Sequence, residues 1–276
     1  MKLLRTTGLL LLAASVTACI HNRTHSAAAD GGVEPEEAST EAGVRGPSRV
    51  EGETRSIFGG TVKNWVDLSA EGTVTKFSWL MPLATVSGVP DTTTSDFLQT
   101  IGVPDVLTKQ TFIQGLDYAF LPKGHSPPGV YDIPHWEWHV FASSQAVFEG
   151  IDCSDQTIPA QDDLPPNYIY QPYPFVLVCA PHQGGVHVYD QTSAEFNKQK
   201  FTRAFALTVY AGSFASIEPK VTRDVLLARQ SFTSPVPVMK TLRRTTPTLY
   251  PSTFSATYDQ ATDSYTVTLS DFRAVQ

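Results

Sequence analysis

The chain has 276 residues, a formal net charge of −7 and a sequence pI of about 5.5. This acidic balance argues against binding nucleic acid or anionic lipid through charge, and no run of Lys or Arg reverses it locally. The sequence also lacks a G-x-S-x-G elbow, a P-loop, a Gly-rich dinucleotide fingerprint and a C-x-x-C pair. Metal chemistry is therefore the one catalytic option in view.

The first 18 residues have the pattern of a secretory leader. Lys2 and Arg5 precede an apolar run at 9–14, and small residues at 16–18 precede Cys19. The segment resembles a bacterial lipoprotein signal with its lipobox, which implies cleavage before Cys19 and lipidation of that cysteine. The run is too short for a transmembrane helix, so lipid is the predicted membrane attachment. An ordinary secretory signal is the alternative, and it changes the anchor but not the compartment.

Residues 19–56 are predicted to form a lipidated, flexible tether. They are rich in Ala, Gly, Glu and Pro and contain almost no large apolar residue. Such a composition cannot bury enough surface to offset chain entropy, so we expect a spacer that holds residues 57–276 away from the bilayer. The expected location is the bacterial cell envelope. The absence of Asp after Cys19 favours the outer membrane.

The folded part opens with a predicted hairpin. Residues 61–66 and 73–80 alternate between apolar and polar, and a short Ser-Ala-Glu-Gly segment separates them. Residues 94–101 are predicted to form a short helix that starts near Asp96. Residues 112–121 predict a strand that leads into a loop rich in Gly, His and Pro.

The segment 124–141 carries the most information about function. Residues 135–139 read His-Trp-Glu-Trp-His after a proline, and this alternation has the period of a strand. On a strand, His135, Glu137 and His139 share one face, and Trp136 and Trp138 share the other. Two imidazoles beside a carboxylate are ligands for a divalent metal such as Zn, Fe or Mn. The H-x-E-x-H spacing excludes the helical H-E-x-x-H metalloprotease arrangement.

Strand geometry limits how many of these side chains one ion can use. Successive residues on one face lie about 6.6 Å apart, which separates His135 from His139 by about 13 Å. We therefore expect two ligands from this strand and others from elsewhere in the chain. The alternative is a strand of stacked aromatic residues whose His and Glu side chains hydrogen-bond to each other or to backbone.

Residues 150–174 are rich in proline and aspartate, which indicates a long surface excursion. Cys153 and Cys179 remain once Cys19 is lipidated, and in an oxidising compartment they most simply form a disulfide. That bond would close a loop of roughly 26 residues and contribute about 3 kcal/mol on the loop-entropy model. The rival interpretation makes both thiolates metal ligands.

The remaining chain predicts further strands. Residues 175–179 and 185–189 read as strands and 193–196 as a helical turn, whereas 221–229 fits a helix or a strand. Two hairpins are predicted, one from 202–210 and 213–218 and one from 253–258 and 265–269. The predicted fold is mainly β: a single antiparallel sandwich or barrel-like domain with little helix.

Three other residues complete the set of candidate metal ligands. His125 lies in the Gly/Pro loop before the H-x-E-x-H strand, His187 in a second predicted strand, and Glu218 at the end of a third. Taken alone, each of these residues is better explained as a hydrogen-bonded polar residue. They are candidates because few other side chains could complete a four- or five-coordinate site.

Three nearby polar residues have supporting or incidental roles. Tyr131 and Asp132 could hydrogen-bond to the imidazoles and fix their tautomers, although Asp132 equally fits the cap of a turn. His182 is predicted to be a solvated loop residue.

At these positions the chain resembles a family of bacterial secreted proteins of unknown function. They share a G-H-x-P-P-G-x-Y-D-x-P-H-[FW]-[DE]-[FW]-H signature and a β-rich single domain, and the likeness spans most of 57–276. This chain has Trp136, Glu137 and Trp138 where the family often has Phe, Asp and Phe. The resemblance implies a fold and the location of a site, and it implies no activity. The six candidate ligands all fall in matching segments: His125, His135, Glu137, His139, His187 and Glu218.

Two functions follow from these observations. The first is an envelope lipoprotein with a divalent-metal site that binds or acts on a small molecule, with Glu137 or Glu218 as general base where it is not a ligand. The second is a non-enzymatic envelope protein whose His/Glu cluster is metal-free. In the second, exposed Trp136 and Trp138 would serve packing or a subunit interface. Catalytic residues and a homo-oligomer both stay open.

Overall fold

The computed structural model describes residues 46–155, 157–170, 179–181, 184–240, 242 and 247–275. The predicted signal peptide, Cys19 and His182 lie outside these ranges, as does most of the strand expected at 175–179. The account below concerns the described residues, which belong to one compact unit.

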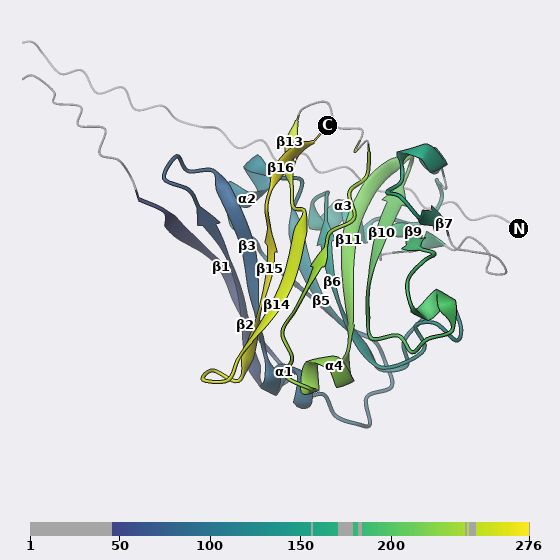
Figure 1. Cartoon of the computed structure of the whole chain (residues 1–276), viewed down its shortest axis with the longest axis horizontal. Coiled ribbons are helices and arrows are strands. Elements are labelled where there is room, and N and C mark those ends of the chain that lie inside the picture. The colour runs from purple at the N-terminus through teal and green to yellow at the C-terminus, as the bar shows by residue number, and fades with distance from the viewer. Residues whose placement is uncertain are drawn as a thin grey trace, which may run out of the picture. The chain divides into compact units, whose positions relative to one another are not determined.

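Six antiparallel strands form the first sheet, in the spatial order β1-β2-β3-β15-β14-β12 (Figure 1). Both hairpins expected in this part of the chain are confirmed, as β2–β3 and β14–β15. The strands of this sheet are β1 Ser48–Ile57, β2 Gly60–Leu68, β3 Val74–Pro82, β12 Phe232–Pro235, β14 Thr253–Asp259 and β15 Ser264–Ser270.

The second sheet runs in the order β4-β5-β6-β11-β10-β9-β7, with β8 also paired to β9. The H-x-E-x-H strand is β6, an interior strand that lies between β5 and β11. The hairpin predicted around residue 211 is β10–β11. The strands of this sheet are β4 Phe97–Ile101, β5 Gly115–Leu121, β6 His135–Phe141, β7 Tyr168–Tyr170, β8 Cys179–Ala180, β9 Gly185–Asp190, β10 Arg203–Tyr210 and β11 Ser213–Thr222.

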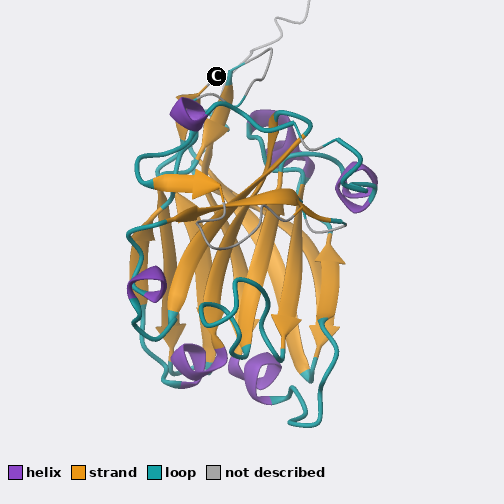
Figure 2. Ribbon diagram, turned by 90° about the vertical axis from the view of Figure 1, so that its right-hand side faces the viewer, coloured by secondary structure: helices purple, strands orange, loops and turns teal. Residues whose placement is uncertain are grey.

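Helices are few and short, and Figure 2 shows them around the ends of the strands. A third, two-stranded sheet pairs β13 (Thr248–Tyr250) with β16 (Arg273–Val275). No helix in the described part of the chain is long and apolar enough to cross a membrane. The helices are α1 Leu83–Ser87, α2 Asp105–Gln110, α3 Gln145–Glu149 and α4 Arg223–Leu227, with 3-10 turns η1 Gln161–Asp163 and η2 Glu195–Asn197.

The main core lies between the two large sheets, so the predicted mainly β, antiparallel sandwich with little helix is confirmed. Trp79 of β3 meets Trp138 of β6 with ring centroids 5.8 Å apart, and both rings pack near Phe254 of β14. Trp136 and Trp138 have no exposed surface. The idea that they serve a subunit interface is therefore wrong, because they fill the sandwich interior.

Two expectations about local structure are corrected. Residues 94–101 are not a helix; β4 occupies Phe97–Ile101 because the fully buried strand β5 needs a hydrogen-bonding partner along its second edge. The tether does not extend to residue 56, because β1 starts at Ser48 and pairs along β2. Most residues of β1 are exposed, so its composition resembles that of a tether.

The ambiguous segment 221–229 contains both elements: β11 ends at Thr222, and α4 follows at once. The excursion after residue 150 holds only η1 and the three-residue strand β7 within its described part. Cys153 and Cys179 are bonded, with Cα atoms 5.8 Å apart, so the predicted disulfide is confirmed and the thiolate-ligand interpretation is excluded.

Candidate metal centre

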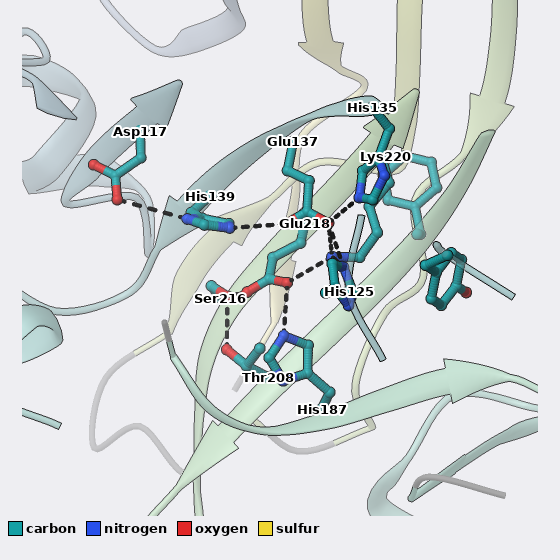
Figure 3. Close-up of polar contacts among 12 residues, drawn as sticks. Asp117, His125, His135, Glu137, His139, His187, Thr208, Ser216, Glu218 and Lys220 are labelled. Atoms are coloured by element: carbon teal, nitrogen blue, oxygen red, sulfur yellow. Dashed lines mark hydrogen bonds and ion pairs between the residues drawn. The ribbon is translucent and has the colours of Figure 1, made fainter. Parts of the chain in front are cut away.

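A buried polar cluster lies on the face of β6 that points away from the sandwich core (Figure 3). His135, Glu137 and His139 project from β6 on this face, as the alternation predicts. The adjacent strand β11 contributes Glu218 and Lys220, and the register places Lys220 directly opposite Glu137. The cluster is therefore a cross-strand arrangement on adjacent strands, the kind of pairing through which side chains on one sheet face interact.

Small residues leave room for these side chains, and aromatic rings cover them. Ala119 of β5 lies opposite Glu137, and Ala206 of β10 lies opposite Glu218. Phe201 packs edge-on against His135 with centroids 5.3 Å apart, and Phe148 lies 6.2 Å from His139. Glu137, His139, Glu218 and Lys220 are consequently all buried.

Glu137 is the centre of the cluster. Its Oε1 lies 2.8 Å from His125 Nε2 and 2.9 Å from His135 Nε2, and its Oε2 lies 3.1 Å from His139 Nε2. His135 and His139 thus contact different oxygens of one carboxylate. Each oxygen of Glu137 therefore faces a different histidine of this strand.

The loop before β6 brings His125 to Glu137. Gly124 has φ +64°, and a Cβ there would lie 1.8 Å from the carbonyl oxygen of Tyr131, so only glycine fits. The His125 amide donates to that same carbonyl at 3.1 Å. Asp132 accepts from the Gly129 amide at 3.0 Å, which makes it the cap of a turn. Tyr131 donates its hydroxyl to Glu195 and offers the imidazoles only ring contacts.

Backbone carbonyls select the tautomers of two histidines. His135 Nδ1 lies 2.7 Å from the Ile133 oxygen, and His125 Nδ1 lies 2.5 Å from the Ser126 oxygen. A carbonyl only accepts, so we assign a proton to each Nδ1. A neutral ring then points its Nε2 lone pair at Glu137 Oε1. Burial lowers the pKa of His125 more than Glu137 raises it, which favours the neutral ring there.

Lys220 supplies a positive charge inside the cluster. Its ammonium donates to Glu137 Oε1, lies 3.3 Å from Glu218 Oε2 and 3.4 Å from His125 Nε2, and has no exposed surface. Burial alone would lower the pKa of Lys220, but Glu137 and Glu218 outweigh burial and raise it. The sequence-based selection misses Lys220, although Ser216, Glu218 and Lys220 alternate along β11 as the residues of β6 do.

His139 lies between acids. Asp117 Oδ2 is 3.6 Å from His139 Nδ1, which is too long for a hydrogen bond but short enough for an ion pair. Burial would lower the pKa of His139; Glu218, Asp117 and Glu137 together outweigh it and raise the pKa to about 10. The imidazole is therefore protonated at neutral pH when no metal competes for it.

Glu218 connects the cluster to two more strands. His187 Nε2 of β9 lies 3.2 Å from Glu218 Oε2, and Ser216 donates to Glu218 Oε1 at 2.9 Å. Because the Ser216 hydroxyl donates its hydrogen to Glu218, it can only accept from Thr208, whose hydroxyl lies 2.6 Å away. Burial would raise the pKa of Glu218, but His187, Lys220 and His139 hold it far below its usual range.

Two groups of three side chains bring their ligand atoms within 4.8 Å of one another. The first is His125, His135 and Glu137; the second is Glu137, His139 and Glu218. Five of the six predicted ligands are thus in a group, and the sixth, His187, contacts Glu218. The first group has a partly open side, since the His125 side chain is 25% exposed. The same residues also form hydrogen bonds and ion pairs with one another.

Comparison with protein-family models, with curated proteins and with solved structures finds no match to this chain. The functional interpretation therefore rests on the geometry of the cluster.

Replacing Lys220 by Met should destabilise the metal-free protein by about 3–5 kcal/mol, because it leaves Glu137 and Glu218 buried with less compensating charge. Urea unfolding in the presence of a chelator measures this. The matched control is Lys63→Met, which removes an exposed lysine 3.9 Å from Glu51 and should change stability by less than about 1 kcal/mol. A loss at Lys220 as small as that at Lys63 would contradict the role assigned to the ammonium.

The metal-free protein should lose stability as the pH rises. His139 has a folded-state pKa raised from 6.5 to about 10, so its stabilising proton is fully in place below pH 6.5. That contribution, at most about 5 kcal/mol, disappears as the pH rises through 10. Unfolding free energies from pH 6 to 10 measure the slope, and His139→Gln should flatten it. Parallel profiles for the two proteins would show that His139 does not bind the proton.

Proposed function

We propose that this protein binds one divalent metal ion in the cell envelope, with His125, His135 and Glu137 as its protein ligands. The observation that carries this proposal is the orientation of the two imidazoles. Each Nδ1–H is held by a backbone carbonyl, and each Nε2 is aimed at the same carboxylate oxygen. A carbonyl behind Nδ1 is the usual support of a histidine that ligates metal through Nε2.

The Lys220 ammonium relieves this geometry only in part: it donates to Glu137 Oε1 and lies 3.4 Å from His125 Nε2, but among the described residues it makes no contact with His135 Nε2. Two nitrogen lone pairs would face a carboxylate oxygen at 2.8 and 2.9 Å. Metal bonds of about 2.1 Å place two ligand atoms of one ion about 3.0 Å apart at right angles and about 3.4 Å apart in a tetrahedron. The two nitrogen–oxygen separations are close to the smaller of these values. An ion placed between the three side chains would therefore replace the repulsion between lone pairs by coordination bonds.

The charge of the cluster supports a single ion. Glu137, Glu218 and Asp117, counted as carboxylates, together with the Lys220 ammonium, carry a formal charge of −2 when the imidazoles are neutral. One divalent ion neutralises this charge, and a second would leave an excess of buried positive charge. In the metal-free protein the His139 proton offsets half of this charge, so an ion bound by His125, His135 and Glu137 would release that proton through charge repulsion, without His139 as a ligand.

A set of two imidazoles and one carboxylate suits Zn, Fe or Mn. Three protein ligands leave coordination positions for water or for a small molecule, and the partly exposed His125 marks the side from which either would arrive. A metal in such a site acts as a Lewis acid, which polarises a bound carbonyl or activates water. Glu218 is a poor general base here because its ion pairs hold its pKa far below the usual range, which weakens its affinity for a proton.

The envelope location is proposed from the N-terminal sequence, with residues 1–18 as a lipoprotein signal and Cys19 as the lipidated residue. The Cys153–Cys179 disulfide supports it, because such bonds persist in oxidising compartments.

A second function is favoured by Lys220. Its ammonium already contacts Glu137, Glu218 and His125, so the chain supplies a cation of its own. On this view the cluster is a metal-free network of ion pairs and hydrogen bonds in a non-enzymatic envelope protein.

Metal analysis of purified protein distinguishes the two functions. With Cys19→Ser used to release the chain from lipid, we expect about one equivalent of Zn, Fe or Mn, lost in His135→Ala and in Glu137→Gln. His187→Ala is the matched control, since His187 contacts Glu218 but is not a ligand in the proposed site. Substoichiometric metal that is unchanged by His135→Ala would support the metal-free network. Loss in His139→Ala with retention in His135→Ala would place the ion in the second group.

The anchor is tested separately. Cells expressing the full chain and fed labelled palmitate should yield a labelled membrane-bound protein, and Cys19→Ser should yield unlabelled protein. Equal labelling of both would contradict lipidation at Cys19.

A further inference from the structure

A cavity of about 480 Å³ opens between the two large sheets. Its lining comes from β10 and β11 of the second sheet and from β12 and β14 of the first, with single residues from β7, β9 and β16. The volume falls within the range of about 300–1,000 Å³ typical of small-molecule sites. Lys220 also lines this cavity, so the cavity adjoins the cluster around Glu137 at that residue, but none of the six candidate metal ligands lines it.

The walls of the cavity combine apolar with polar surface. Phe205 of β10 and Val221 of β11 face Phe254 of β14, and Val236 extends the wall beyond β12. These residues also belong to, or pack against, the main core. A ligand that enters here would thus bury apolar surface against an existing core.

Three positively charged residues line the cavity, two arginines and Lys220. Arg203 and Arg273 line it, and neither has an ion-pair partner among the described residues. The Arg203 guanidinium lies 4.8 Å from the centre of the Phe232 ring, which holds it at the rim. Asp190 is the one acidic lining residue in the described part of the chain. Its Oδ1 already accepts two hydrogen bonds from Thr192, at 2.7 and 2.9 Å.

We propose that this cavity binds an amphiphile with a single carboxylate and an unbranched apolar chain, of the fatty-acid class. The carboxylate would pair with the planar guanidinium groups of Arg203 and Arg273, which match its geometry. The acyl chain would lie against the wall that Phe205 and Phe254 form together, since their rings are in edge-on contact with centroids 5.1 Å apart. The apolar part of the walls explains the affinity for the chain, and the unpaired arginines explain the selection of an anion over a neutral amphiphile.

Calorimetric titration with decanoate and with decanol tests the proposal on Cys19→Ser protein held in chelator. We expect one decanoate per chain and at least tenfold weaker binding of decanol. The double variant Arg203→Gln/Arg273→Gln should weaken decanoate binding at least tenfold. The matched control is Arg55→Gln, which replaces an exposed arginine of β1 paired with Glu53. This variant should bind decanoate with the same affinity as the Cys19→Ser protein.

A second variant fills the cavity without changing its charge. Ser234→Trp projects from β12 into the lining and should abolish decanoate binding while circular dichroism confirms the fold. Three results would overturn the proposal: no decanoate binding, equal affinity for decanol, or no effect of the arginine substitutions. Because the protein is metal-free here, a negative result would leave the metal proposal untouched.

Discussion

A single buried carboxylate organises the polar face of this protein. Glu137 lies on an interior strand of an eight-stranded sheet, where desolvation would raise its pKa, yet the Lys220 ammonium holds that pKa well below its usual range. An ionised carboxylate is costly in such a place unless cations and hydrogen-bond donors surround it. The pairing of β6 with β11, the loop before β6 and the small residues on β5 and β10 all serve this requirement.

The same strand also builds the core. On β6, Trp136 and Trp138 point into the sandwich while His135, Glu137 and His139 point out of it, so one seven-residue strand has two buried faces of opposite chemistry. The close ring contacts with Trp79 hold the backbone of β6 in place. A rigid backbone in turn fixes the positions of the ligand atoms, which a site needs in order to favour one ion geometry.

The sequence predicts those features that depend on local alternation. The H-x-E-x-H strand, the three hairpins and the disulfide can be inferred because each is encoded in residues close together or limited to two cysteines. Lys220 could not be found in this way, since its partnership with Glu137 joins residues 83 positions apart and depends on the register of β6 with β11. The two edge strands could not be predicted for a different reason. β1 is mostly exposed and β4 has mixed polarity, so neither sequence shows a clear period of two.

The ligands of the proposed site do not all come from equally rigid parts of the fold. His135 and Glu137 sit within a central strand, whereas His125 is held by a loop that turns at Gly124 and is the exposed member of the set. Affinity and exchange rate would then be governed by different segments. The strand pair would set how tightly an ion is retained, and the opening of residues 124–132 would set how fast it enters or leaves.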